Sequence, residues 1–372
     1  MKSSSAILDA PSGGETIIDG ELVRGPARPE RLRVSVVLAT YNRPERLLGV
    51  IAQLDAQVGV EGLEIVVVDD GGSVSAIETL KERPSSLPLR VLRRSNGGPG
   101  PARDTGISQA IGDIVLLLDD DMSIGPSFVA QHVQAHDDGA DVVLGHIYSP
   151  DQADLALFER FHLDSLARFV VLHQDGKTAP VGVHLCTGNV SFRRDAYHRV
   201  GGFDLSLRRC EDRDLGLRFE VAGYRFAFCV DARSEHRTDH DDAAEWRSRS
   251  RLFGRLDARI AEKHPMHATA SPWAFLPKLP MPIRPLLIGS ACVPRAGRAF
   301  AGLIYFASEH IDRWSSSSKR RLARFGAKLA MIGASMTYAM DYFAGVGDSF
   351  SSRNPQQVLA SHRRHKTLQV GT

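Results

Sequence analysis

Short apolar runs alternate with amphipathic segments between residues 33 and 147. The apolar runs are rich in Val, Ile and Leu, which is typical of strands buried on both faces of a parallel sheet. The predicted strands are 34–39, 63–68, 89–92, 114–118 and 142–147, and the predicted helices lie near 44–57, 74–83, 101–111 and 126–137. This alternation predicts an α/β fold with a mainly parallel sheet flanked by helices.

Polar residues follow three of the predicted strands directly. In open parallel sheets, ligands bind beyond the carboxyl ends of the strands, so these positions are candidates for a site. The three segments are Thr40-Tyr41-Asn42-Arg43-Pro44, Asp69-Asp70-Gly71-Gly72 and Asp119-Asp120-Asp121.

The three adjacent carboxylates of Asp119, Asp120 and Asp121 follow a buried strand. They repel one another, and a hard divalent cation such as Mg²⁺ or Mn²⁺, which prefers oxygen ligands, would relieve that repulsion. Asp119 and Asp121 are two residues apart, so in an extended segment they project to the same side. The pair predicts a site for one ion, or for an ion and a ligand's phosphates. A solvated strand-to-loop junction is the alternative interpretation.

A glycine-rich turn runs into a helix at residues 96–106, Asn-Gly-Gly-Pro-Gly-Pro-Ala-Arg-Asp-Thr-Gly. It lacks the Gly-Lys-Ser/Thr of a P-loop and the Gly-x-Gly-x-x-Gly order of a dinucleotide site, which disfavours ATP and NAD. Arg103 near the helix start could reach a diphosphate, which the helix amino end would also favour. A surface ion pair with Asp104 is the alternative.

Taken in order, these motifs resemble the family 2 glycosyltransferases of the GT-A fold. The family pattern is Thr-Tyr-Asn-Arg, Val-Asp-Asp, Asn-x-Gly-x-x-x-Ala-Arg-Asn-x-Gly and Asp-x-Asp; here Asp104 replaces the usual Asn of the third motif. Further along, residues 201–204 (Gly-Gly-Phe-Asp) and 211–219 (Glu-Asp-Arg-Asp-Leu-Gly-Leu-Arg-Phe) are similar to the family's last elements. The resemblance covers residues 33 to 240, roughly, and its order is more specific than any single motif.

The resemblance implies an inverting enzyme that moves a sugar from a nucleotide-diphosphate sugar, a UDP-sugar by expectation, to the hydroxyl of a saccharide, lipid-linked or other acceptor. It implies Asp212 as the catalytic base, and a Mn²⁺ or Mg²⁺ cofactor held by Asp119, Asp121 and His236. A competing position for the histidine is His240, in the acidic run 239–242. The implied donor-binding residues are Thr40, Tyr41, Arg43, Asp69, Asp70, Gly98, Arg103, Asp119 and Asp120.

Residues 211–222 predict a helix with an apolar stripe of Leu215, Phe219 and Ala222. Asp212 is three residues before Leu215, so its carboxylate should face inward with that stripe. Acidic residues in a first helical turn are ordinarily satisfied by the helix dipole and free N–H groups, and this capping role is the alternative for Asp212.

The 372 residues are 43% hydrophobic and 24% charged, with a formal net charge of +2, which is typical of a globular protein. The balanced charge argues against general nucleic-acid binding. The four cysteines are scattered without a Cys-x-x-Cys spacing, which predicts a reducing, cytoplasmic environment. We expect neither a signal peptide nor a spanning helix, because no sufficiently long apolar run exists.

The expected organisation is a disordered segment 1–30, a GT-A domain 31–255, a proline-rich connection and helical extension 256–348, and a disordered tail 349–372. The extension should be helical near 299–312 and 319–344, with basic residues at 319–321, 324 and 328. Such a basic and partly apolar helix could contact an anionic membrane surface peripherally. Internal packing or a homodimer is the alternative.

Two other functions are weighed against the transferase. A sugar nucleotidyltransferase also uses a nucleotide, a divalent ion and an α/β sheet, but it needs a glycine-rich loop after the first strand, which residues 40–44 do not provide. A catalytically silent module that binds glycan or nucleotide is the other. The presence of Asp119, Asp121 and Asp212 argues against a silent module without proving turnover.

Overall fold

The structure is a computed structural model that describes residues 18–27, 32–83, 85–149, 155–207, 209–236, 242–274, 276–316, 320–350 and 355–370. The chain divides by packing into two compact units. The first comprises Met1–His146 and Leu185–Ser234, and the second comprises Ile147–His184 and Glu235–Thr372. The expected boundary of the catalytic domain at residue 255 stays a prediction, because this division follows packing and not function.

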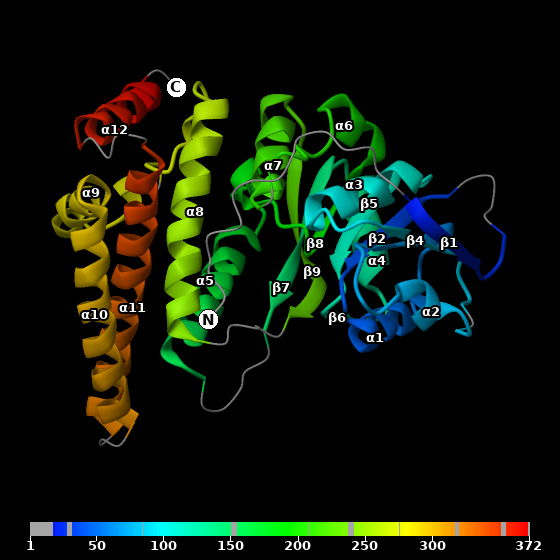
Figure 1. Cartoon of the computed structure of the whole chain (residues 1–372), viewed down its shortest axis with the longest axis horizontal. Helices are drawn as coiled ribbons and strands as arrows, with labels where there is room; N and C mark the ends of the chain where they lie inside the picture. The colour runs from blue at the N-terminus through cyan, green and yellow to red at the C-terminus, as the bar shows by residue number, and fades with distance from the viewer. Residues whose placement is uncertain are drawn as a thin grey trace. The chain divides into compact units, whose positions relative to one another are not determined.

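The sheet is mixed and nine-stranded, in the order β1-β4-β3-β2-β5-β8-β7-β9-β6 (Figure 1). Its strands are β1 Ile18–Arg24, β2 Val34–Thr40, β3 Leu63–Asp69, β4 Leu89–Arg94, β5 Ile114–Asp119, β6 Met122–Ile124, β7 Val142–Tyr148, β8 Asn189–Arg193 and β9 Phe226–His236. Strands β4, β3, β2 and β5 are parallel neighbours. All seven residues of β3 are buried, which explains why such strands are continuous apolar runs in the sequence.

The register of the parallel strands brings the predicted polar segments to one edge. Thr40 at the end of β2 pairs with Asp69 at the end of β3. On the other side of β2, Ala39 pairs with Asp119 at the end of β5. The carboxyl ends of the three strands therefore lie level, and the segments that follow them are neighbours.

The helices of the first unit cover this sheet (Figure 1). They are α1 Pro44–Asp55, α2 Ala76–Leu80, α3 Pro99–Gln109, α4 Phe128–Asp137, α6 Arg194–Arg199 and α7 Glu211–Val221. Helix α1 buries Leu47, Val50, Ile51 and Leu54, the spacing expected of one helical face. The predicted strands and helices of this region are confirmed, within a few residues at their ends.

The second unit is mainly helical in its described part. Its helices are α5 Leu157–His173, α8 Ala243–Lys263, α9 Arg284–Cys292, α10 Pro294–Ser316, α11 Arg320–Ser349 and α12 Pro355–Val370. Trp273 is fully buried and stacks on Phe343, with ring centroids 5.1 Å apart. The predicted C-terminal helices are confirmed as the longer α10 and α11. In the part of the chain that the structure describes, no helix is long and apolar enough to cross a membrane.

Two terminal segments differ from the predicted disorder. Strand β1 lies within 1–30 and pairs antiparallel with β4, and helix α12 lies within 349–372. Val358 of α12 is 1% exposed within the core around Trp273, and the indole N–H of Trp273 donates to the Ser361 hydroxyl at 3.1 Å. Both elements are held by partners distant in the sequence, so their local composition gave no signal.

Candidate active site

Arginines neutralise the carboxylates that follow β5. The Arg43 guanidinium Nη1 lies 2.8 Å from a carboxylate oxygen of Asp121 and 3.2 Å from one of Asp120. Arg46, one turn further along α1, adds a contact to Asp121 at 3.3 Å. The Thr40 hydroxyl donates to Asp120 at 2.6 Å. Burial raises the pKa of Asp120, whereas Thr40 and Arg43 lower it. Guanidinium groups thus relieve the repulsion for which the sequence suggested a cation.

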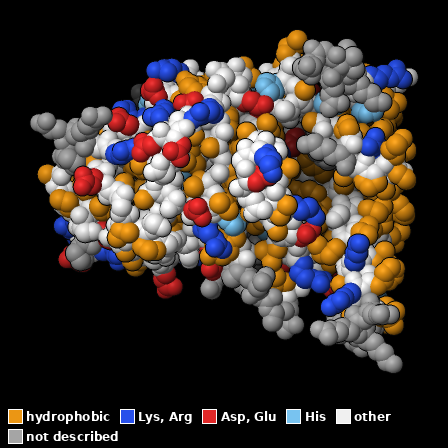
Figure 2. All heavy atoms as spheres, turned by 180° about the vertical axis from the view of Figure 1, so that it is seen from behind, with side chains coloured by type: hydrophobic (Ala, Val, Ile, Leu, Met, Phe, Trp, Pro, Cys, Tyr) orange, Lys and Arg blue, Asp and Glu red, His pale blue; other side chains and the backbone are white. Residues whose placement is uncertain are grey.

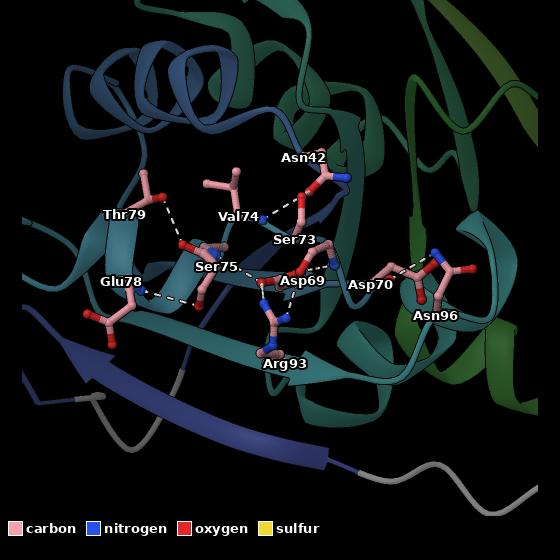
Figure 3. A network of polar contacts seen from close by, with 12 residues as sticks. Asn42, Asp69, Asp70, Ser73, Val74, Ser75, Glu78, Thr79, Arg93 and Asn96 are labelled. Atoms are coloured by element: carbon pink, nitrogen blue, oxygen red, sulfur yellow. Dashed lines mark hydrogen bonds and ion pairs between the residues drawn. The ribbon is translucent and has the colours of Figure 1, made fainter.

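Asp69 organises the loop after β3 (Figure 3). It is 1% exposed, and it accepts hydrogen bonds from the backbone N–H groups of Gly72 and Ala76 at 3.2 and 2.9 Å. Arg93 on β4 donates to the same carboxylate at 2.6 Å and to the Gly72 carbonyl at 2.6 Å. Asp69 is therefore committed to shaping the loop, and the site for a base or ribose that the resemblance implies would lie on the loop it builds.

Asn42 ties the loop after β2 to the loop after β3 (Figure 3). Its side-chain oxygen accepts from the Ser73 hydroxyl at 3.1 Å and from the Val74 N–H at 3.0 Å. Asn42 has φ 56°, a left-handed conformation that Asn tolerates better than most residues. Tyr41 beside it is 50% exposed. The loop therefore presents an aromatic ring to solvent at the sheet edge, where a flat nucleotide base could stack.

Asp70 holds the glycine-rich turn before α3. Its two carboxylate oxygens accept from the N–H groups of Gly97 and Gly98, at 3.0 and 2.8 Å. Burial raises the pKa of Asp70, and these N–H groups and Arg94 lower it. Gly98 has φ 93° and precedes the helix as its cap residue, which explains a glycine there. The turn therefore places the start of α3 beside the ends of β3 and β4.

Arg103 on α3 joins Asp119 to the start of α7. It is 8% exposed, and it donates to Asp119 at 2.6 Å and to Glu211 at 3.2 Å. Burial alone would lower the pKa of Arg103, but Asp119 and Glu211 raise it. Burial, which disfavours the charged carboxylate, and the nearby charge of Asp212 raise the pKa of Glu211 to about 7, although Arg103 lowers it. Arg103 therefore pairs with Asp119 and Glu211, and the alternative interpretation, a surface ion pair with Asp104, is wrong.

Asp104, the departure from the family pattern, accepts from the Tyr197 hydroxyl at 2.6 Å. The same hydroxyl accepts from the N–H of Phe203 at 3.0 Å. Burial and the Asp104 charge raise the pKa of Tyr197. Asp104 therefore anchors the turn at 201–204 to α3, and it has a structural contact here.

Helix α7 differs in one respect from the predicted inward-facing stripe. Leu215 and Phe219 are buried as expected, but Ala222 is exposed because the helix ends at Val221. Asp212 is half-buried, not fully inward, and its carboxylate accepts from the N–H of Arg213 at 2.7 Å. A half-buried carboxylate in the first turn can be reached by a ligand, as a base must be.

The oxygens of Asp119 and Asp121 suit a hard divalent cation in their chemistry. The Asp119 side chain is 35% exposed, so a ligand can reach it. Within the described residues, no three His, Cys, Asp or Glu side chains are grouped as a metal site. The structure thus pairs each of these two carboxylates with an arginine, and a metal held by both stays a prediction.

His236 is half-buried at the end of β9 and belongs to the second unit, whereas Asp119 and Asp121 belong to the first. Its role as a metal ligand stays a prediction. The competing His240 and the acidic residues at 239 and 241 lie outside the described residues. Asp242 caps α8 by accepting from the Glu245 N–H at 2.7 Å.

The sequence pattern missed three residues of this network: Arg46, Arg93 and Glu211. A signal existed for two of them. Arg46 follows Arg43 by three residues, so both lie on one face of α1. Glu211 stands in the same Glu-Asp motif as Asp212, but its pairing with Arg103 depends on how α7 meets α3. Arg93 had no local signal, because β4 contains three arginines and its sequence does not distinguish Arg93 from the other two.

Residues 35–201 match the family model described as glycosyl transferase family 2. This segment is a family 2 glycosyltransferase domain. The fold of the chain is similar to that of a mannosyltransferase from Pyrobaculum calidifontis, which was solved in complex with GDP-Man and Mn²⁺. The TM-score is 0.55 over 91% of each chain, at 18% identity. The predicted GT-A fold with a helical C-terminal extension is confirmed.

The chain is also similar to two curated glycosyltransferases. A pre-mycofactocin glycosyltransferase of Mycobacterium tuberculosis is 29% identical over 65% of this chain and 50% of its own length. A dolichol-phosphate mannosyltransferase of Pyrococcus furiosus is 31% identical over 32% of this chain and 34% of its own length. The chain thus spans half or less of these relatives.

Proposed function

We propose that this chain is an inverting glycosyltransferase that moves a sugar from a nucleotide-diphosphate sugar to an acceptor hydroxyl, assisted by a divalent cation. The observation that carries the proposal is the network at the carboxyl edge of β2, β3 and β5. There Arg103 joins Asp119 to Glu211, and thereby joins the strand end to the helix that carries Asp212. This network contains carboxylates that would bind a cation, arginines that would bind a diphosphate and a carboxylate that would accept a proton.

The donor would lie across this edge. Tyr41 and Thr40 would hold the base and ribose together with the loop after β3, in which the role of Asp69 would be to keep the loop in shape. Arg43 and Arg103, with the amino end of α3 at Gly98, supply the positive charge that a diphosphate requires. Arg43 contacts Asp121 and Arg103 contacts Asp119 in the structure, so both guanidinium groups already face the carboxylates that would hold the cation.

A cation bound by Asp119 and Asp121, with His236 as the proposed third ligand, would stabilise the negative charge that develops on the departing diphosphate. Mn²⁺ or Mg²⁺ suits these oxygen donors, and the Pyrobaculum neighbour was solved with Mn²⁺. Asp120 remains bonded to Thr40 and Arg43, so its role would be to keep the strand end in place.

Asp212 would act as the general base. It would accept the proton of the acceptor hydroxyl as the oxygen attacks the anomeric carbon, and the bond to the diphosphate oxygen would break with its electron pair leaving on the nucleotide. One such displacement inverts the anomeric centre. Glu211 suits this role less well, since the residue is 5% exposed and its carboxylate is bound to Arg103.

We propose a UDP-sugar as the donor and a lipid-linked or saccharide hydroxyl as the acceptor. Support for a lipid-linked acceptor comes from the names of relatives, a dolichol-phosphate mannosyltransferase and an undecaprenyl-phosphate 4-deoxy-4-formamido-L-arabinose transferase. A GDP-sugar is the second donor class to test, because the Pyrobaculum neighbour was solved with GDP-Man.

Calorimetric titration of UDP and GDP, each with Mn²⁺, Mg²⁺ or chelator, tests this function. One nucleotide should bind only with the cation, and Asp121→Asn should weaken its affinity by about tenfold or more, since a carboxylate ligand is lost. Asp195→Asn on α6 is the matched control, because its exposed carboxylate pairs with Arg199 four residues along, on the surface.

Equal affinity with and without chelator would remove the cation from the proposal. Binding without release of the nucleotide diphosphate from any sugar nucleotide, over a panel of acceptors, would favour the silent binding module. Formation of a sugar nucleotide from a nucleoside triphosphate and a sugar phosphate would favour the nucleotidyltransferase.

A further inference from the structure

Helices α10 and α11 pack closely as an antiparallel pair in the second unit. Gly333 of α11 lies against the Ser308 side chain of α10, and Gly326 lies against Ser315, where an added Cβ would come within 2.5 Å of the Ser315 Cβ. The α11 number falls as the α10 number rises, so the helices run in opposite directions. Small residues stand at both of these contacts, so the two helices pack closely on each other here.

A second set of apolar side chains on these helices is exposed to solvent. We call this set the apolar stripe; its members are Phe300 (47% exposed), Leu303 (65%), Phe306 (61%) and Trp314 (55%) on α10, and Leu322 (51%), Phe325 (67%), Leu329 (42%) and Ile332 (48%) on α11. Their spacings, three, three and eight residues on α10 and three, four and three on α11, place them along one face of each helix. Figure 2 shows hydrophobic side chains gathered over the helices of this unit, with Lys and Arg among them.

Single exposed hydrophobic residues are ordinary, but a gathered set marks an interaction surface. The exposed Arg, Lys, Asp and Glu side chains described on α10 and α11 are all basic. Exposed basic side chains on the two helices are Arg295, Arg298, Arg313, Arg324 and Lys328. Lys328 is three residues after Phe325 and four before Ile332, so it borders the stripe on α11, and Arg324 lies one turn before Lys328 on the same side.

The acidic residues of the same helices are directed to partners within the unit. Asp312 pairs with Arg160 of α5, Asp341 with Arg247 and Asp348 with Arg251 of α8. The remaining acid, Glu309, is half-buried and hydrogen-bonds to Tyr305. The stripe is therefore apolar with a positive border, and its helices contribute no exposed acidic side chain to it.

We propose that the apolar stripe docks α10 and α11 onto the surface of an anionic phospholipid membrane. Apolar side chains would enter the boundary between head groups and acyl chains, while Arg and Lys would reach the lipid phosphates. A second copy of the chain fits less well, because a two-fold pairing over the stripe would bring the basic borders of both copies together without acidic partners. The proposal goes beyond the proposed function and does not depend on it.

The test is flotation of the purified full-length protein with vesicles of phosphatidylcholine, with or without one part in four of phosphatidylglycerol. At low salt the protein should bind the anionic vesicles about tenfold more strongly than the neutral ones. At about 1 M NaCl, where the screening length falls to about 3 Å, that difference should disappear.

Two double variants separate the apolar and basic contributions. Leu303→Ser with Phe325→Ser should weaken binding to the anionic vesicles by about tenfold or more, and Arg324→Gln with Lys328→Gln should do the same at low salt only. Matched controls are Val171→Ser on α5, where the side chain is 69% exposed, and Arg259→Gln on α8, where it is exposed. Both controls should bind as the wild type does.

An intact protein that stays unbound at low salt would overturn the proposal, as would stripe variants that bind as well as the wild type. A dimer in sedimentation velocity that dissociates in the serine variant would assign the stripe to a second copy instead. Should the serine variant lose its helical circular dichroism, the Gln variant, with exposed side chains only, decides the outcome. Nucleotide affinity measured on the same proteins should not change, which separates this test from that of the transferase function.

Discussion

Two adjacent carboxylates open helix α7, and they differ in burial and in partner. Glu211 is bound to the buried Arg103, whereas Asp212 is half-buried and accepts from a backbone N–H. We predict that Asp212→Asn lowers turnover by about 10² or more, the scale of a lost general base, and leaves nucleotide affinity within a few fold. Steady-state rates and calorimetry on the same preparation measure both quantities.

Glu211→Gln is the matched comparison for Asp212→Asn. It also replaces one carboxylate by an amide, one residue away, and Gln can still accept from Arg103. We expect a smaller loss of turnover than in Asp212→Asn. If the two variants lose turnover equally, or if Glu211→Gln loses more, then Glu211 is the base and Asp212 is a capping residue.

Glu211 also predicts how stability depends on pH. Burial, together with the charge of Asp212, raises its pKa from 4.5 to about 7 in the folded chain. The folded state therefore holds this proton more tightly than the unfolded state does. The stabilisation is complete below about pH 4.5 and is lost as pH rises through about 7, by at most about 3 kcal/mol. Glu211→Gln should remove this loss, which thermal unfolding between pH 5 and 8 can measure.

The comparison with the wild type is needed because other buried groups act in the opposite direction. Burial lowers the pKa of His132 to about 3 and that of His136 to about 4. Both stabilise the fold above about pH 6.5 and lose that stabilisation as pH falls, in wild type and variant alike. The difference between Glu211→Gln and wild type should therefore grow with pH. Parallel stability curves for the two proteins would show that Glu211 carries no raised pKa.

At the scale of elements, the packing of α3 on β2 depends on one glycine. A Cβ at Gly106 would overlap the side chain of Val37 in the buried strand. We predict that Gly106→Ala lowers the free energy of unfolding by about 1–3 kcal/mol, as overpacking does. Gly49 on α1 has nothing within 4 Å of an added Cβ, so Gly49→Ala should stabilise the helix by about 0.5–1 kcal/mol. Urea unfolding with equal m-values would establish both changes. A neutral Gly106→Ala would mean that α3 can move away from the sheet.

The elements of the sheet could be predicted because their signals are local. Strands such as β3 are buried along their whole length, so each is a continuous apolar run, and the polar residues that follow stand at its carboxyl end. β1, α12 and the grouping of α5 with the C-terminal helices could not be predicted this way. Each of these depends on partners far along the chain.

The same limit applies to the site. The sequence pattern predicted that Thr40, Asp69 and Asp119 lie at one edge of the sheet, and the strand register confirms this. It did not reveal which arginine pairs with each carboxylate. Arg103 reaches both Asp119 and Glu211 only because α3 and α7 meet, 108 residues apart in the chain. Charge balance in a buried network is a property of the tertiary structure.

At the scale of the whole molecule, the proposed donor residues, including Thr40, Asp69, Arg103 and Asp119, belong to the first unit, as does the proposed base Asp212. The apolar stripe belongs to the second unit. The two properties can therefore be measured separately in one protein, by following hydrogen exchange of each unit.

We predict that the nucleotide diphosphate that binds, added with Mn²⁺, slows amide exchange chiefly in the first unit, in segments 40–46, 69–72 and 97–103. At a nucleotide concentration of about 100 Kd, the linkage adds about 2.7 kcal/mol to any opening that releases the ligand. Amides of α10 and α11 should change little, because they carry none of the proposed donor contacts. Asp121→Asn at the same nucleotide concentration should show less protection in all three segments, since it binds more weakly. Protection of α10 and α11 equal to that of the first unit would show instead that donor binding is coupled to the second unit.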